Sequence, residues 1–229
     1  MLLSDVDAVV FDKDGTLVDV QLTWGPAVVR ALHDFVEDVD VRQRVAAALG
    51  LDLSTARLMP DSPIIAETNA ELGARIAAVT GGRTADVTGV FDELVERYGR
   101  DTVVPLAGVD RMLSALSDAG VWVGLATNDS EGSAAGQLRS LGWAPFFDSI
   151  VGYDSGFGGK PGPGMLVASA ERAGCPLERL LMVGDTATDA GAANAAGCRV
   201  VLLGEQAPEE LDVTVVVASV TEIPALLGL

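Results

Sequence analysis

The amino-acid sequence predicts an α/β protein, in which a Rossmann-like parallel sheet has helices on both faces and a small all-helical insert follows the first strand. Three observations support this prediction. Short continuous apolar runs, typical of strands buried on both faces, recur in the outer parts of the chain. Segments with helical periodicity separate these runs. Between about residues 18 and 100 the apolar runs disappear and helical periodicity continues alone.

Six apolar runs are the predicted strands, and polar residues follow several of them directly. These runs cover residues 8–11, 121–125, 149–151, 180–183, 200–203 and 213–217. The segments between them predict helices that end at or shortly before a glycine. These helices cover residues 108–118, 131–141, about 163–174 and about 189–197.

The insert shows four helical patterns, and Ser62 is a candidate N-cap with Pro63 at the first helical position. We therefore expect a core built from residues 1–17 and 101–229, and a helical domain built from residues 18–100. The four patterns cover residues 24–38, 41–49, 63–79 and 85–98.

Composition excludes several classes of protein. The chain has 229 residues, 49% of them hydrophobic, which is enough to bury a sizeable core. A formal net charge of −18 argues against nucleic-acid and membrane partners. No apolar run reaches the roughly 20 residues of a membrane span, and the start of the chain resembles a strand and not a signal peptide. With Cys175 and Cys198 as the two cysteines, we expect a cytoplasmic protein. The oligomeric state is not predicted.

Asp12 and Asp14 follow the first predicted strand in the segment Asp-Lys-Asp-Gly-Thr. Side chains two positions apart in extended backbone point the same way, so both carboxylates are expected to face one site while Lys13 points elsewhere. Such a pair needs a cation or a shared proton. One carboxylate can then be a nucleophile held ionised on a metal, and the other an acid or base for the leaving group. A plain acidic turn is the alternative. An EF-hand is excluded, because Gly15 comes at the fourth position and not the sixth.

Two further motifs supply groups that bind anions. Thr127 and Asn128 follow the second predicted strand, where a hydroxyl and backbone N–H groups can hold phosphate oxygens, or can simply cap a helix. Lys160 lies in Gly-Gly-Lys-Pro, which is not a P-loop because proline follows the lysine. It can neutralise phosphoryl oxygens and keep Asp12 ionised, or it can be a solvated loop residue. The chain has two lysines, Lys13 and Lys160, and both lie in such motifs.

Asp185 and Asp189 form the last motif, directly after the strand predicted at 180–183. Asp185 can ligate a hard cation, and Asp189, one helical turn later, can brace that ligand or Lys160. Ordinary helix capping is the alternative. Ligands of open parallel sheets bind beyond the carboxyl ends of the strands, so the four motifs are expected to converge on one site.

Together these motifs resemble those of the haloacid dehalogenase (HAD) superfamily. Asp12–Thr16 with Leu17 and Val18 matches its first motif, Thr127 the second, Lys160 the third, and Asp185 with Asp189 the fourth. The resemblance covers residues 5–18 and 101–229. The insert lies where this superfamily carries a C1-type cap, and the chain is similar to the phosphoglycolate phosphatase-like branch.

The resemblance implies an Mg²⁺-dependent phosphatase that acts on a small phosphorylated metabolite, such as a phosphoglycolate-like compound or a sugar phosphate. Asp12 would attack phosphorus and form an aspartyl-phosphate, and Asp14 would protonate the leaving oxygen. Mg²⁺ would be held by Asp12, the backbone carbonyl of Asp14, and Asp185. Thr127, the N–H of Asn128 and Lys160 would bind the phosphoryl group.

Single residues distinguish between the related activities of this superfamily. Dehalogenases of the superfamily lack the second carboxylate, so Asp14 favours phosphate over halide. Phosphonatases need a lysine in the cap, and no lysine occurs between Lys13 and Lys160, so phosphonatase activity is excluded. A β-phosphoglucomutase-like phosphotransferase and a non-catalytic phosphate-binding regulatory protein remain alternatives.

Substrate-contacting residues in the insert are harder to predict. Arg57 and the stretch that ends with Thr68 and Asn69 are candidates, because a loop between insert helices is well placed to cover the core. His33 is interpreted as a surface or packing residue. The three tryptophans are interpreted as packing residues, namely Trp24, Trp122 and Trp143.

Overall fold

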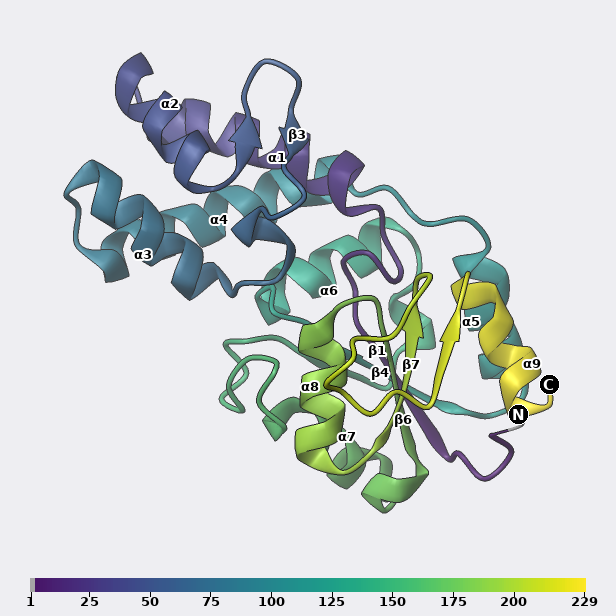
Figure 1. Cartoon of the computed structure of the whole chain (residues 1–229). Coiled ribbons are helices and arrows are strands. Elements are labelled where there is room, and N and C mark those ends of the chain that lie inside the picture. The colour runs from purple at the N-terminus through teal and green to yellow at the C-terminus, as the bar shows by residue number, and fades with distance from the viewer. Residues whose placement is uncertain (1–2) are drawn as a thin grey trace.

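The computed structural model describes residues 3–229 and contains six parallel strands in one sheet, with strand order β5-β4-β1-β6-β7-β8 (Figure 1). The predicted α/β fold with a parallel sheet is confirmed. All six predicted strands are present, and their ends shift by at most two residues. Their bounds are Ala8–Phe11 (β1), Trp122–Ala126 (β4), Ser149–Val151 (β5), Leu180–Gly184 (β6), Arg199–Leu203 (β7) and Val215–Val217 (β8).

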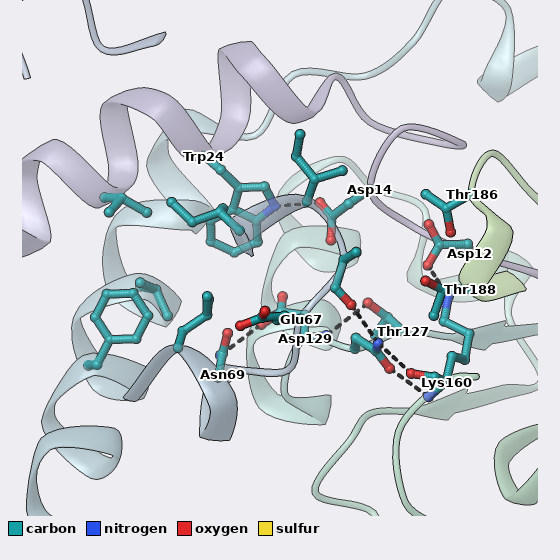
Figure 2. Close-up of a pocket in the computed structure, with 18 residues that line it drawn as sticks. Asp12, Asp14, Trp24, Glu67, Asn69, Thr127, Asp129, Lys160, Thr186 and Thr188 are labelled. Atoms are coloured by element: carbon teal, nitrogen blue, oxygen red, sulfur yellow. Dashed lines mark hydrogen bonds and ion pairs between the residues drawn. The ribbon is translucent and has the colours of Figure 1, made fainter. Parts of the chain in front are cut away.

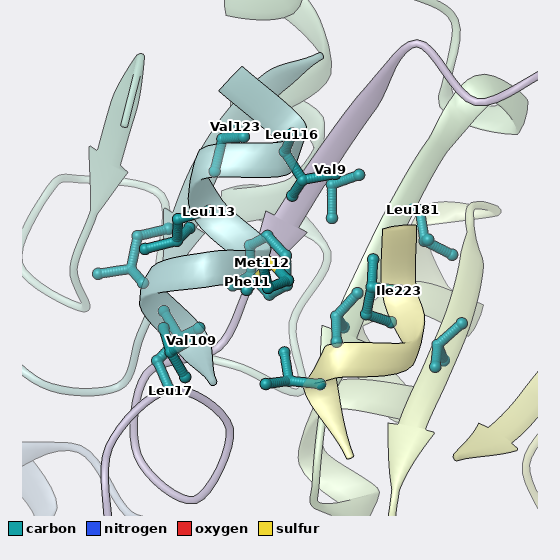
Figure 3. Close-up of a cluster of buried hydrophobic side chains, with 14 of the residues drawn as sticks. Val9, Phe11, Leu17, Val109, Met112, Leu113, Leu116, Val123, Leu181 and Ile223 are labelled. Atoms are coloured by element: carbon teal, nitrogen blue, oxygen red, sulfur yellow. The ribbon is translucent and has the colours of Figure 1, made fainter. Parts of the chain in front are cut away.

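Helices cover both faces of this sheet because successive strand residues point to opposite sides. Val9 and Phe11 of β1 pack into one buried cluster with α5, α6 and α9 (Figure 3). Ala8 and Val10 pack into a second cluster with α7 and α8. The core helices are α5 (Val109–Asp118), α6 (Glu131–Ser140), α7 (Gly164–Ala173), α8 (Ala187–Ala196) and α9 (Ile223–Leu227), with 3₁₀ turns at Ala144–Phe146, Leu177–Arg179 and Val220–Glu222.

Residues 18–100 lie mostly above the carboxyl ends of the strands and have a buried hydrophobic cluster of their own, which includes Trp24, Leu72 and Phe91 (Figure 1). None of the helices described for residues 3–229 has the length and apolarity needed to cross a membrane. The elements here are α1 (Val20–Phe35), α2 (Val39–Ala48), β2 (Leu51–Asp52), β3 (Arg57–Leu58), a 3₁₀ turn (Pro63–Ile65), α3 (Asn69–Thr80) and α4 (Thr84–Thr102).

Two details of the predicted insert are wrong. It is not all helical, because β2 and β3 form an antiparallel hairpin in which Leu51 faces Leu58, and both side chains are buried in the insert's own core. The predicted helix at 63–79 is also interrupted. Thr68 and Glu71 form a capping box that starts α3 afresh, and the residues before it make only a 3₁₀ turn capped by Ser62.

Candidate active site

Three neighbouring strands end beneath the same part of the insert. Asp12 follows the last residue of β1, Thr127 follows β4, and Asp185 follows β6. Because β1 lies between β4 and β6 in parallel register, the polar residues that follow these strands meet at one edge of the sheet. The structure thus brings the predicted motifs together.

Lys160 joins this group from the loop between β5 and α7. Its buried Nζ lies 2.5 Å from Asp12 Oδ1 and 2.6 Å from Asp189 Oδ1. Burial alone lowers the pKa of Lys160, but the carboxylates of Asp12 and Asp189 raise it above its ordinary value. Lys160 therefore stays a cation beside Asp12.

Asn128 holds the lysine loop in place. Its Oδ1 accepts a hydrogen bond from the Lys160 backbone N–H at 2.8 Å, and its Nδ2 donates to the Lys160 carbonyl at 3.0 Å. Nδ2 also donates to the carbonyl of Ala66 in the insert at 2.9 Å. The side chain of Asn128 thus links the second motif, the lysine loop and the insert, whereas the sequence indicated only its backbone N–H.

Asp189 braces its neighbours, as the sequence predicts. Its Oδ2 accepts hydrogen bonds from the backbone N–H groups of Asp185 and Thr186, at 3.2 and 3.0 Å, and from the Thr186 hydroxyl at 2.8 Å. Its Oδ1 accepts from Lys160. Since both oxygens of Asp189 have these partners, Asp12 and Asp185 are the carboxylates with capacity for another ligand.

The residues here fit a hard divalent cation. Oxygens of Asp12, Asp185 and Asp189 lie within 4.8 Å of one another. Burial, followed by the repulsion of nearby carboxylates, raises the pKa of Asp12 well above its ordinary value and that of Asp185 to about 7. A cation between them would relieve this repulsion. Gly15 keeps the space open, because a Cβ at that position would lie 2.1 Å from Asp185 Oδ2.

Asp14 has partners that the sequence did not indicate. The Lys13 Nζ lies 2.8 Å from Asp14 Oδ2, and the Trp24 Nε1 donates to Asp14 Oδ1 at 2.5 Å. Lys13 does not line the cavity that Asp12 and Asp14 line, which agrees with the expectation that it points elsewhere, but its ammonium contacts Asp14, which strand alternation does not predict. The chain turns directly after Asp12, where the Lys13 carbonyl accepts from the N–H of Leu17 at 2.9 Å, so the alternation of an extended strand stops.

Lys13 is fully buried between acidic and aromatic groups. Its Nζ lies 3.2 Å from Asp129 Oδ2, donates to Gln137 Oε1 at 2.7 Å, and lies 4.6 Å from the centre of the Trp24 ring. Burial alone lowers the pKa of Lys13, but Asp14 and Asp129 raise it above its ordinary value. The scarcity of lysine in the chain is the one sequence signal that pointed to this residue.

Residues 6–197 match the model of the haloacid dehalogenase-like hydrolases, and the match includes all four motifs of the site. The chain belongs to the haloacid dehalogenase-like hydrolase family. This result confirms the resemblance found in the sequence.

Relatives of this haloacid dehalogenase-like hydrolase include bacterial phosphoglycolate phosphatases. The protein of Shigella dysenteriae is 30% identical over 98% of this chain and 94% of its own length. That of Rhodospirillum rubrum is 33% identical over 86% of this chain and 78% of its own.

Solved structures show the same fold. CbbY from Rhodobacter sphaeroides, in complex with phosphate, has a TM-score of 0.70 at 18% identity and covers 98% of this chain and 100% of its own. The HAD-hydrolase YfnB from Bacillus subtilis, bound to magnesium, has a TM-score of 0.71 at 19% identity and covers 98% and 99%.

A small cavity, partly open to solvent, lies between the core of this hydrolase and its insert. Figure 2 shows Asp12, Thr127 and Lys160 gathered in one part of it and Trp24 in another, where it is joined to Asp14. Trp24, interpreted from the sequence as a packing residue, thus also lines the site. Trp143 is buried in the core as expected.

The three predicted insert residues differ in position. Asn69 lines the cavity, and its Nδ2 donates to Asp129 Oδ1 at 3.4 Å. Thr68 caps α3 and is not among the lining residues, although a Cβ on Gly159 would lie 2.8 Å from its methyl group. Arg57 is exposed on the hairpin and does not line the cavity. His33, interpreted as a surface or packing residue, is exposed on α1.

Proposed function

We propose that this protein is an Mg²⁺-dependent phosphatase that hydrolyses a small phosphorylated metabolite through an aspartyl-phosphate on Asp12. One observation carries the proposal. The carboxylate of Asp12 lines the cavity and lies 2.5 Å from the ammonium of Lys160. A phosphoryl group placed there would meet a nucleophile and a fixed positive charge together, which is what phosphoryl transfer chiefly requires.

Asp12 and Asp185, with the backbone carbonyl of Asp14, would hold the metal. Bound there, Mg²⁺ supplies charge neutralisation for the phosphoryl oxygens. Thr127 and the N–H of Asn128 would donate to the same oxygens, and Asp189 would position Lys160. These assignments rest on the shared position of the residues at the strand ends and on the open carboxylate oxygens of Asp12 and Asp185.

Asp14 would give its proton to the leaving oxygen and later take one from the attacking water. Its contacts with Lys13 and Trp24 hold its side chain at the border between the polar and apolar parts of the cavity. A group that serves both half-reactions must keep one position, and two partners from different elements provide this.

Residues 18–100 would act as a cap domain on a core of residues 1–17 and 101–229. The insert has its own hydrophobic cluster and supplies residues to the cavity wall, including Trp24 and Asn69. A lid of this kind excludes water while phosphorus is attacked. The names of the relatives make 2-phosphoglycolate the first substrate to test, with sugar phosphates beside it.

The proposal is tested by release of p-nitrophenol from its phosphate ester with Mg²⁺. We expect turnover by the wild type and a loss of roughly 10⁴-fold or more in Asp12→Asn, which removes the nucleophile. Asp118→Asn, an exposed change at the end of α5, is the matched control. Equal rates in wild type and Asp12→Asn would refute the mechanism. Phosphate release without a bisphosphate activator separates a phosphatase from a phosphotransferase.

A further inference from the structure

The part of the cavity near Trp24 is built from the insert and is apolar. In Figure 2 the side chains without polar atoms gather mostly on the Trp24 side, away from Lys160. They come from α1, the 3₁₀ turn, α3 and α4, four separate elements that pack together in the insert. These side chains form an apolar wall, in which Ile64 and Ile65 are partly exposed, while Val28, Leu72, Phe91 and Val95 are buried in the insert's own hydrophobic cluster and back the wall.

Positive charge is missing from this wall. Among the described residues that line the cavity, Lys160 is the single cation, and its Nζ is bound to Asp12 and Asp189. Lys13 lies behind Asp14 and Asp129 and does not line the cavity. A negatively charged leaving group on this side would therefore meet apolar side chains, carboxylates and the amide of Asn69, without a counter-charge.

The carboxylates that line the cavity near this wall are already paired with basic side chains of the protein. Asp14 and Asp129 share the ammonium of Lys13. Glu67 accepts a hydrogen bond at 2.6 Å from Nε of Arg75, which is outside the lining set. Because these charges are matched within the protein, a cationic leaving group gains little here. The cavity therefore favours an uncharged leaving group whose carbon atoms pack against the apolar side chains.

We infer that the substrate is a phosphate monoester of a small, uncharged and mainly apolar alcohol, whose carbon part packs against Trp24 and the apolar wall. This inference rests on the proposed function. In the reaction, Asp12 bonds to phosphorus as the bond to the alcohol oxygen breaks, and Asp14 protonates that oxygen. Water then releases inorganic phosphate, and Asp12 is restored.

Three esters of similar size test the inference: n-propyl phosphate, 2-phosphoglycolate and O-phosphoethanolamine, whose carbon chains end in methyl, carboxylate and ammonium. We expect kcat/KM of the purified enzyme with Mg²⁺ to be at least about 10-fold higher for propyl phosphate than for either charged ester, because a charge buried without a partner is costly. Preference for 2-phosphoglycolate or phosphoethanolamine would overturn the inference. If p-nitrophenyl phosphate is still cleaved in that case, the proposed function stands.

A variant tests the wall directly. Ile65 is only partly buried, so Ile65→Arg places a cation at the wall where its stem can still pack. We expect the ratio of kcat/KM for 2-phosphoglycolate to that for propyl phosphate to rise about 10-fold. Val90→Arg adds the same charge to an exposed position of α4 outside the cavity and should leave the ratio unchanged. An equal change in both variants would assign selectivity to overall charge and overturn the inference.

Discussion

Lys13 offers a sharp test of how the site is held together, through the substitution Lys13→Met. The side chain is fully buried, and its Nζ lies 2.8 Å from Asp14 and 3.2 Å from Asp129. Methionine keeps most of the volume and the contact with Trp24 but removes the charge. Two carboxylates would then lie in the same buried region without their common cation.

The expected cost is large. Removing one partner of a buried ion pair typically costs about 3–5 kcal/mol, since the remaining charge stays desolvated. For a chain of this size, that corresponds to a fall in Tm of roughly 10 °C. The matched control is Arg139→Met, which removes one positive charge from an exposed position of α6 and should change stability by less than about 0.5 kcal/mol.

The pH dependence of this stability loss distinguishes the loss of a charge from a loss of packing. Burial raises the pKa of Asp129 above its ordinary value even with Lys13 present, and loss of that cation raises it further. A carboxyl with a raised pKa in the folded state costs stability as pH rises from its ordinary pKa to the raised one, and the cost stays at its full size above that value. The deficit of Lys13→Met relative to wild type should therefore be largest near pH 8 and shrink toward pH 5.

Urea unfolding at pH 8 and pH 5, followed by tryptophan fluorescence and circular dichroism, measures this deficit. Adding Asp129→Asn to Lys13→Met should recover part of the lost stability, because it removes one of the two carboxylates that were left without a cation. A variant within 1 kcal/mol of wild type at pH 8 would refute the reasoning, given the cost of about 3–5 kcal/mol expected above. So would a deficit that does not change with pH.

Two further predictions concern the metal site. Since the pKa of Asp185 is raised to about 7 by burial and neighbouring carboxylates, the metal-free protein should lose stability as pH rises from about 4 to 7, and Mg²⁺ should raise Tm more at pH 8 than at pH 5.5 in thermal unfolding. An equal rise at both values would contradict this. Gly15→Ala should weaken Mg²⁺ activation of p-nitrophenyl phosphate cleavage, because its Cβ would lie 2.1 Å from Asp185 Oδ2. Gly156→Ala, also at positive φ but in open space, is its control and should not.

Much of the core was predictable because its signals are local. Each strand of the sheet is a short apolar run, and its alternation fixes which residues face α5 and which face α7. The positions of Asp12, Thr127 and Asp185 follow from this, since each comes directly after a strand of a parallel sheet. Asp189 was also predictable, because one helical turn separates it from Asp185.

The insert was less predictable. Short hairpins such as β2 and β3 give two-residue strands with no alternation to detect. The break before α3 depends on the Thr68–Glu71 capping box, which competes with an apolar pattern that continues across it. Arg57 was a candidate because loops between helices can cover a core, but the hairpin directs this loop to the surface.

The sequence by itself determined the sheet, the meeting of the four motifs and, through Asp14, the choice of phosphate over halide as the proposed chemistry. Only the tertiary structure decided what surrounds that chemistry. Lys13 meets Asp129 and Gln137, more than a hundred positions away, because α6 packs behind the first motif. The apolar wall around Trp24 forms because helices α1, α3 and α4 pack together, and local periodicity marks their residues only as buried.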